Sequence, residues 1–422
     1  QPLLELLPGR AGLRAHPATA SARARQPLMA PRQGAAKRFE QIQTPVIPVM
    51  AELIRQCPGT LSLGQGVARW GPPAETFAAL ENALTSGRDL HLYGAMGGDP
   101  ELQESLRSWL EREHQIDLSG SALVITAGSN MAFNAVIQSL CDPGDEVILP
   151  VPYYFNHEMA IRLAGGVPIA VDAGVIPDPE QLTAAITPRT RAIVTVSPNN
   201  PSGTVLPRPV LEAINHCCAE HGLMHISDEA YALFHYGPEQ PWSPGSAGGS
   251  GAHTISLGSL SKSHGMAGWR VGWAVVPQTL LPALTKVQDT ILICPPRLNQ
   301  RAAAGALAAG ADWCRNKIRE LVEPRQQVLS ALDQGGAPWR LLSNADGAFY
   351  ALLEVDTPLS PDALMERLIR RHGVALASGS SFGLKRCCLR LSYGMLGRAD
   401  LAEALERLQR GLLESAALAS PS

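Results

Sequence analysis

Short runs of β-branched and apolar residues alternate with helical segments between residues 122 and 276, and this alternation constrains the fold most strongly. The predicted strands are 122–126, 145–149, 167–171, 192–196, 224–227, 254–257 and 271–276. Strands that are separated by helices usually pair in parallel, and the helices then cover both faces of the sheet. The sequence therefore predicts an α/β fold with a mostly parallel sheet.

Beyond residue 300 the pattern changes to long helices with few strands. One helix is predicted over 299–333, followed by strands at 348–354 and 388–391 and a final helix over 398–416. This pattern predicts a smaller α+β domain that is appended to the α/β core. A length of 422 residues also favours two domains over one.

Charge, hydropathy and cysteine spacing exclude several classes of function. The net charge is −3 and no long run of one sign follows the N-terminal segment, so neither nucleic acid nor an anionic membrane surface is an expected partner. No uncharged apolar stretch reaches ~18 residues, so no membrane span is expected. The eight cysteines include no C-x-x-C pair with metal spacing. We therefore expect no metal site, and reduced thiols in a cytoplasmic protein.

The first 36 residues differ from the rest in composition. Glu5 is their only acidic residue, and their arginines stand among Ala, Pro and Ser. These arginines are Arg10, Arg14, Arg23, Arg25 and Arg32. We predict a disordered extension over residues 1–36, with a transit peptide, or sequence upstream of a start at Met29, as the alternatives.

One lysine lies in a glycine-rich turn directly after the predicted strand 254–257. It is Lys262, one of five lysines in the chain, and Arg270 follows eight residues later. A lysine amine forms a Schiff base with an aldehyde when burial or a neighbouring cation lowers its pKa. Arg270 could supply that cation and also bind a phosphate. The alternative is an ordinary surface lysine.

Polar residues also follow other predicted strands, where ligands bind in an open parallel sheet. Asp228 closes one strand and Tyr231 lies three residues later, although Asp228 could equally cap the next helix. Asn200 lies in a run of Asn, Pro and Gly that also suits a simple turn. Gly128 stands at a strand-to-helix junction, where the first amides of a helix suit a phosphate.

The pattern Ser-x-x-Lys-x-x-x-x-x-Gly-x-Arg-x-Gly over 259–272 resembles the cofactor-lysine motif of the class I and II aminotransferases. The Asp-Glu-x-Tyr run at 228–231 and the Asn-Pro-Ser-Gly run at 200–203 match the same family, with Ser202 in place of Thr. The matching motifs follow the family's order from about residue 40 to 415. The main departure is the segment 378–383, which begins with Ser where relatives often have Pro.

The resemblance implies the fold and the assembly. Family members are pyridoxal-phosphate (PLP) enzymes of fold type I, which have a large domain with a mostly parallel seven-stranded sheet between helices. By this resemblance, the large PLP-binding domain covers 76–310, and the smaller α+β domain covers 37–75 and 311–422. It also implies a homodimer, in which Tyr93 reaches the phosphate in the neighbouring subunit.

The resemblance further implies the residues that hold PLP. Lys262 would bind its aldehyde as a Schiff base, Asp228 would pair with the ring nitrogen, and Tyr154 would stack on the ring. The alternative for Tyr154 is a core aromatic residue. Tyr231 and Asn200 would hydrogen-bond the ring hydroxyl oxygen. The phosphate would be held by the residues of the strand-to-helix turn and by the serine and arginine of the lysine motif. These residues are Gly128, Ser129, Asn130, Ser259 and Arg270.

For the substrate, the family pattern implies that Arg390 binds the α-carboxylate, since a planar guanidinium suits that group. Gly66 would let the backbone approach closely, and Asn200 would also contact the substrate. The segments 63–70 and 152–156 resemble plant-type methionine and aromatic aminotransferases, and kynurenine aminotransferases. We therefore expect transamination between an aromatic amino acid or methionine and a 2-oxo acid. A C–S β-lyase on the same fold is the nearest alternative, and a non-catalytic PLP-binding regulator a distant one.

Overall fold

The computed structural model describes residues 34–86, 90–237 and 240–418. The predicted disordered extension over 1–36 lies almost wholly outside these ranges, and the described chain from Arg38 onward belongs to one compact unit. The domain limits between 75 and 76 and between 310 and 311 therefore stay a prediction. Within the described ranges, no helix combines the length and the apolar character that crossing a membrane requires.

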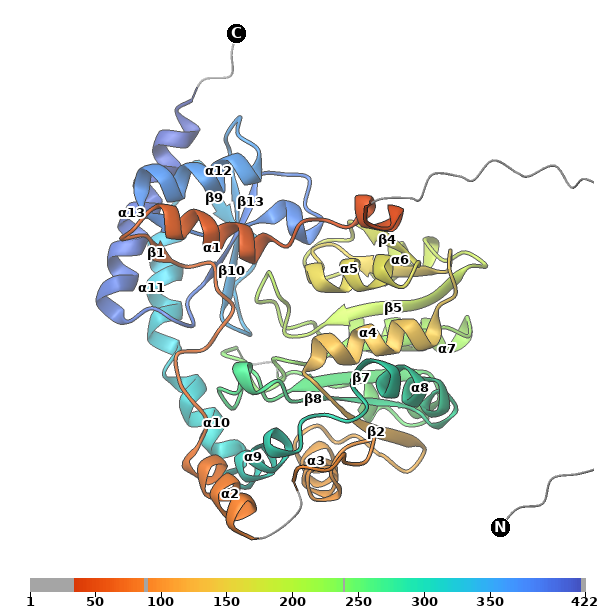
Figure 1. Cartoon of the computed structure of the whole chain (residues 1–422). Coiled ribbons are helices and arrows are strands. Elements are labelled where there is room, and N and C mark those ends of the chain that lie inside the picture. Colours follow the sequence, from red (N-terminus) through yellow and green to blue (C-terminus); the bar gives the residue numbers. More distant parts are fainter. Residues whose placement is uncertain (1–33, 87–89, 238–239, 419–422) are drawn as a thin grey trace, which may run out of the picture. The chain divides into compact units, whose positions relative to one another are not determined.

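A seven-stranded sheet, in the order β2-β8-β7-β6-β5-β3-β4, forms the centre of the fold (Figure 1). Its strands are β2 (Ser121–Thr126), β3 (Glu146–Pro150), β4 (Val167–Val171), β5 (Thr190–Val196), β6 (Met224–Asp228), β7 (Thr254–Ser259) and β8 (Gly272–Pro277). β8 runs antiparallel to its neighbours β2 and β7, and the other neighbouring pairs are parallel. The predicted mostly parallel sheet is confirmed.

Helices cover both faces of this sheet, because successive strand residues point to opposite sides. In β2, Val124 packs into a core with the helices of one face, and Leu123 packs into the core of the other face. The first group of helices is α4 (Ser129–Leu140), α5 (Phe155–Leu163) and α8 (Leu281–Leu292). The second group is α3 (Pro100–Glu113), α6 (Pro179–Ala184), α7 (Arg208–Glu220) and α9 (Arg297–Ala308).

A smaller antiparallel sheet, in the order β12-β13-β10-β9, forms a second layer with its own helices. Its strands are β9 (Trp339–Leu341), β10 (Tyr350–Val355), β12 (Ala377–Ser378) and β13 (Cys388–Ser392). A separate parallel pair joins β1 (Leu61–Ser62) to β11 (Val374–Ala375). The remaining longer helices are α1 (Val46–Gln56), α2 (Ala74–Thr85), α10 (Gly310–Arg319), α11 (Val322–Leu332), α12 (Pro361–Arg367) and α13 (Arg398–Ala416).

The single helix predicted over 299–333 is wrong, because the structure divides it into α9, α10 and α11. Gly310 begins α10 with a φ of +79°, a left-handed conformation that interrupts the preceding helix and that glycine adopts without strain. Pro324 lies in the first turn of α11, where its missing N–H group costs nothing. These two residues mark a helix boundary that the apolar periodicity alone does not reveal.

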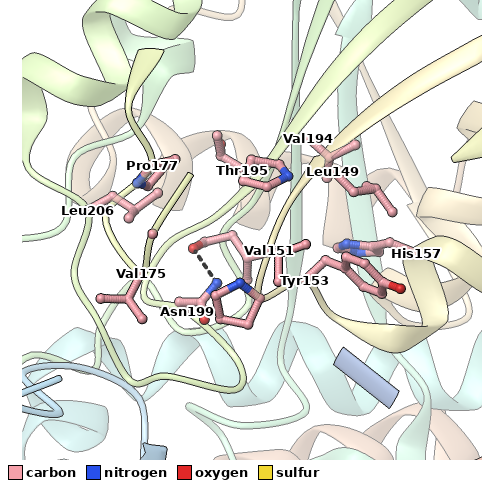
Figure 2. A pocket seen from close by; sticks show the side chains of 14 residues that line it. Leu149, Val151, Tyr153, His157, Val175, Pro177, Val194, Thr195, Asn199 and Leu206 are labelled. Atoms are coloured by element: carbon pink, nitrogen blue, oxygen red, sulfur yellow. Dashed lines mark hydrogen bonds between the residues drawn. The ribbon is translucent and has the colours of Figure 1, made fainter. Parts of the chain in front are cut away.

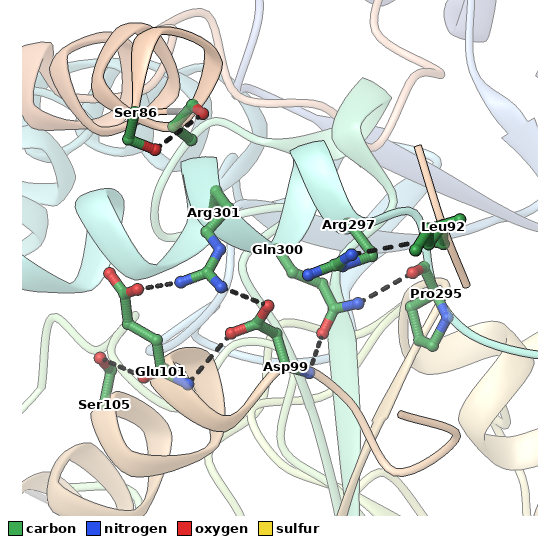
Figure 3. Close-up of polar contacts among 10 residues, drawn as sticks. Ser86, Leu92, Asp99, Glu101, Ser105, Pro295, Arg297, Gln300 and Arg301 are labelled. Atoms are coloured by element: carbon green, nitrogen blue, oxygen red, sulfur yellow. Dashed lines mark hydrogen bonds and ion pairs between the residues drawn. The ribbon is translucent and has the colours of Figure 1, made fainter. Parts of the chain in front are cut away.

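A buried polar network joins the start of α3 to α9 (Figure 3). The Asp99 carboxylate accepts from the Glu101 amide at 3.1 Å and pairs with Arg301 at 2.8 Å. The Asp99 amide in turn donates to the Gln300 side chain at 2.6 Å. Together these contacts fix the end of the segment 90–98, which carries Tyr93.

Candidate functional site

The carboxyl ends of the parallel strands open onto a cavity of about 410 Å³, and most of the predicted site residues line it. From the large-sheet part of the chain these are Ser129, Asn130, Tyr154, Asn200, Asp228, Tyr231, Ser259, Lys262 and Arg270. Gly66 and Arg390 come from the flanking segments. The residues converge because β2, β3, β5, β6 and β7 all end at this edge of the sheet, while β8 starts there.

Lys262 lies inside the cavity, in the turn after β7. Its Nζ donates a hydrogen bond to the Gly66 carbonyl at 2.5 Å. Burial lowers the pKa of the amine to about 8, and the positive charges of Arg390 and Arg270 add to this effect. At neutral pH a much larger fraction of Lys262 is therefore unprotonated than of an exposed lysine, which makes it a competent nucleophile and base.

A cationic corner lies beside the N-terminus of α4. Arg270 has a φ of 54°, and its Nη2 donates to the Ala127 carbonyl at 3.3 Å. A Cβ atom on Gly128 would lie 2.3 Å from Arg270 Nη2, so glycine is required for the guanidinium to approach this turn. The Ser259 hydroxyl donates to Ser261 Oγ at 2.7 Å, and Arg270 Nη1 lies 3.4 Å from the same Ser261 oxygen. Hydroxyls, a guanidinium and a helix N-terminus thus form a cradle suited to a phosphate.

Asp228 supplies the carboxylate of the site at the end of β6. Its Oδ1 accepts from the Ala230 amide at 3.1 Å, and its Oδ2 lies 3.1 Å from Nε2 of His157. His157 stacks on Phe133 with ring centroids 4.0 Å apart, which fixes its plane. Both contacts hold the Asp228 carboxylate in one orientation, with its charge directed at the cavity.

Behind His157 lies a second, much smaller cavity of about 20 Å³ (Figure 2). Nδ1 of His157 is buried and has no hydrogen-bond partner among the described residues. A space of this size holds about one water molecule. Among the described residues, the contact with Asp228 is therefore the one hydrogen bond that the ring nitrogens of His157 make.

Arg390 lies at the opposite end of the cavity, on β13. It is 2% exposed, and its Nη1 donates to Asn200 Oδ1 at 2.9 Å while its Nη2 donates to the Gly64 carbonyl at 2.5 Å. Its guanidinium stacks over the ring of Tyr350 at 4.6 Å. Arg390 thus places a planar cation in the cavity lining, as bidentate recognition of a carboxylate requires.

Two predicted residues lie outside the cavity lining. Gly128 stands behind it, where it makes room for Arg270. Tyr93 does not line the cavity of its own chain and is 77% exposed. Exposed apolar side chains flank it in the sequence, Leu92 at 64% and Met96 at 40%. The predicted contact of Tyr93 with a neighbouring subunit stays a prediction.

Three residues of the site were missed at the level of sequence. Ser261 lies within the lysine motif and could have been found from its spacing to Ser259. His157 lies three residues after Tyr154, so helical periodicity would place both on one face of α5. Tyr350 begins β10, and no local pattern connects it to the cavity.

The residues present fit PLP. A volume of about 410 Å³ lies within the range of cofactor sites. The cradle of Arg270, Ser259 and Ser261 suits the phosphate, the Asp228 carboxylate suits a ring nitrogen, and the Lys262 amine suits an aldehyde. The lowered pKa of Lys262 suits the same role, because it leaves more of the amine unprotonated and able to react with an aldehyde.

The rate at which the apoprotein takes up PLP should depend on pH through Lys262. Its lowered pKa of about 8 predicts a rate that rises about tenfold per pH unit below 8 and levels off above, because only the neutral amine attacks the aldehyde. Stopped-flow absorbance after mixing apoprotein with PLP measures this rate. A midpoint near the ordinary lysine pKa of 10.5 would show that the cavity does not depress the pKa.

Known proteins with a similar sequence and structure are aminotransferases. The family model "Aminotransferase class I and II" matches residues 58–408. An aromatic aminotransferase of Arabidopsis thaliana is 33% identical over 382 residues, covering 87% of this chain and 94% of the relative. An aspartate/prephenate aminotransferase of Thermus thermophilus is 34% identical over 373 residues, covering 86% and 93%. The structure of the Thermus thermophilus aspartate aminotransferase with maleate superposes with a TM-score of 0.80, at 32% identity over 90% of this chain and 100% of that one.

Proposed function

Because the chain belongs to the class I and II aminotransferases and is therefore a PLP-dependent aminotransferase, we propose that its amino donor is an aromatic L-amino acid or methionine and its acceptor a 2-oxo acid. The observation that best supports the proposal is the character of the cavity lining, much of which is apolar or aromatic. The larger side chains of this kind include Ile47, Val67, Tyr154, Phe155 and Tyr350.

The charges of the cavity support the same donors. Among the described residues that line it, the cationic side chains are Lys262, Arg270 and Arg390. The first two belong to the amine and phosphate positions, so Arg390 is left for the α-carboxylate. A second carboxylate, such as that of aspartate, would find no further cation among these residues to offset the loss of its hydration. An apolar side chain gains from the same burial.

We assign the remaining roles to the chain's own residues as follows. Arg390 fixes the substrate carboxylate and thereby orients the bond between Cα and its hydrogen. Lys262 Nζ removes that proton and later delivers it to the reacting carbon on the cofactor, as a general base and acid. Asp228 holds a proton at the ring nitrogen, and Tyr231 donates toward the ring oxygen. When bound, PLP supplies the electron sink that stabilises negative charge at the substrate Cα.

The test of the donor class is a half-reaction in which no acceptor is present. Purified holoenzyme mixed with phenylalanine or methionine should form one equivalent of the 2-oxo acid per site. Aspartate should react about 10-fold or more slowly, since an unpaired buried carboxylate costs more than 1 kcal/mol. Single-turnover formation of the oxo acid, measured by chromatography, gives the three rates directly.

Two outcomes would change the assignment. Faster turnover of aspartate than of phenylalanine and methionine would make the enzyme a dicarboxylate aminotransferase. Continuous release of ammonia and pyruvate from a cysteine conjugate, with no need for an acceptor, would favour the C–S β-lyase.

We also propose that the enzyme works as a homodimer in the cytoplasm, with Tyr93 contacting the neighbouring subunit's phosphate site. The exposed apolar residues at Leu92, Tyr93, Met96 and Ile293 support a contact of this part of the surface with another protein surface. The proposed domain division remains 37–75 with 311–422 against 76–310.

A further inference from the structure

Tyr350 is the first residue of β10 and joins the smaller sheet to the cavity. Its side chain is 1% exposed and lines the cavity beside Arg390. The predicted set of site residues does not include Tyr350. Its contacts nevertheless reach three residues of the predicted site, namely Tyr231, Arg390 and Gly66.

The first contact joins two buried hydroxyl groups. The Tyr350 hydroxyl lies 2.6 Å from the Tyr231 hydroxyl, and the rings are 5.5 Å apart at a steep angle. Burial raises the pKa of Tyr350 to about 12 and the pKa of Tyr231 well above its ordinary value, so both phenols keep their protons at neutral pH. Only one of the two protons can lie between the oxygens. If Tyr231 donates its proton into the cavity, Tyr350 must donate to Tyr231.

The second contact is with the carboxylate-binding arginine. The Tyr350 ring lies 4.6 Å from Arg390 Cζ, and Phe382 lies at 5.3 Å from the same atom. The two rings hold the guanidinium by cation–π contacts in a buried site. The orientation of Arg390 therefore depends on the ring of Tyr350 and not on its hydroxyl.

The third contact involves the backbone that accepts from Lys262. A Cβ atom on Gly66 would lie 2.3 Å from the Tyr350 hydroxyl oxygen, so the phenol occupies the space that a side chain would need. The Gly66 carbonyl in turn accepts from Lys262 Nζ at 2.5 Å. The hydroxyl of Tyr350 thus lies between Gly66 and Tyr231, and the Tyr231 hydroxyl is its hydrogen-bond partner among the described residues.

We propose that Tyr350 is a positioning residue with two separable parts: its hydroxyl directs the proton of Tyr231 into the cavity toward the cofactor's ring oxygen, and its ring holds Arg390 flat for the substrate carboxylate. The proposal rests on the proposed function, because that function assigns Tyr231 and Arg390 their roles. A hydroxyl that receives a hydrogen bond becomes a stronger donor itself. Tyr350 therefore strengthens the bond that Tyr231 makes to the cofactor.

Two substitutions in the holoenzyme separate the parts. Tyr350→Phe keeps the ring and removes the hydroxyl. The pH midpoint at which the visible absorption of the bound cofactor changes should rise by roughly half a pH unit, because Tyr231 becomes a weaker donor to the ring oxygen. kcat should fall by about 5-fold with little change in KM. Tyr350→Leu also removes the ring, and KM for phenylalanine should rise by about 10-fold in addition.

The matched control is Tyr236→Phe. Tyr236 is half-buried and donates its hydroxyl proton to the carbonyl of Ala348 at 2.7 Å, two residues before Tyr350, but it does not line the cavity. Losing this hydroxyl perturbs the same loop to a similar degree. We expect the absorption midpoint and kcat of Tyr236→Phe to stay at the wild-type values, so that a general loosening of the loop is separated from loss of the Tyr350 hydroxyl.

A double-substitution cycle completes the test. If Tyr350 acts through Tyr231, the variant Tyr231→Phe/Tyr350→Phe should have the absorption midpoint of Tyr231→Phe alone. Additive shifts would overturn the proposal, as would an unshifted midpoint in Tyr350→Phe beside a shifted one in Tyr231→Phe. An unshifted midpoint in Tyr231→Phe itself would instead contradict the role that the proposed function gives Tyr231.

Discussion

Replacing Lys262 by alanine should reduce transamination by at least about 10⁴-fold, because the proposed function gives this one side chain both the covalent link to the cofactor and the role of the base that moves the substrate proton. Among the described residues that line the cavity, no other side chain carries a primary amine. Lys317 pairs with Glu320 at 2.8 Å, and Lys286 is exposed on α8. No second lysine can therefore take over. Single-turnover formation of the 2-oxo acid from phenylalanine measures the loss.

The Lys262→Ala variant should still retain PLP, which separates loss of chemistry from loss of the cofactor. The phosphate cradle of Arg270, Ser259 and Ser261 does not involve the lysine. Small primary amines added to the solution should restore part of the rate, because the truncated side chain leaves room for them. Lys286→Ala is the matched control and should behave as wild type. More than about 1% residual activity in Lys262→Ala would assign the proton transfer to another group.

The positions of Lys262, Asp228 and Asn200 could be predicted from sequence for a topological reason. Each follows a strand of one mostly parallel sheet, and the carboxyl ends of such strands meet at one edge. A prediction of where the strands end therefore also predicts which residues converge. The family motifs then identified the chemistry that the convergence serves. Arg390 was identified by the resemblance alone, since its strand belongs to the other sheet.

Contacts between distant segments could not be predicted in this way. Tyr350 and Tyr231 are 119 residues apart in the chain, and their contact depends on how the smaller sheet lies against the larger one. His157 and Asp228 are separated by 71 residues and meet only because α5 packs on the sheet near the end of β6. Helix periodicity gives the buried face of α5 but not the residue that it faces. The break between α9 and α10 was missed for a local reason, the backbone conformation of Gly310.

Replacing Asp228 by asparagine should lower kcat/KM by roughly 10²–10³-fold while leaving the fold intact. The substitution keeps the size of the side chain and removes its charge. A protonated ring nitrogen then has no counter-ion in the cavity, because no other acidic side chain lines it among the described residues. His157 loses its charged acceptor at 3.1 Å as well. kcat/KM with phenylalanine, together with the absorption of the bound cofactor, measures both effects.

Glu229 offers an adjacent carboxylate as the control for this experiment. It is next to Asp228 in the chain and buried, and it accepts from Ser243 at 2.7 Å, but it does not line the cavity. Burial raises the pKa of Glu229 to about 7, so this group is partly neutral already near neutral pH. Glu229→Gln should therefore cost less than about 10-fold in kcat/KM. Equal losses in the two variants would mean that buried charge near β6 matters only for stability. A large loss confined to Asp228→Asn would assign the effect to the carboxylate that lines the cavity.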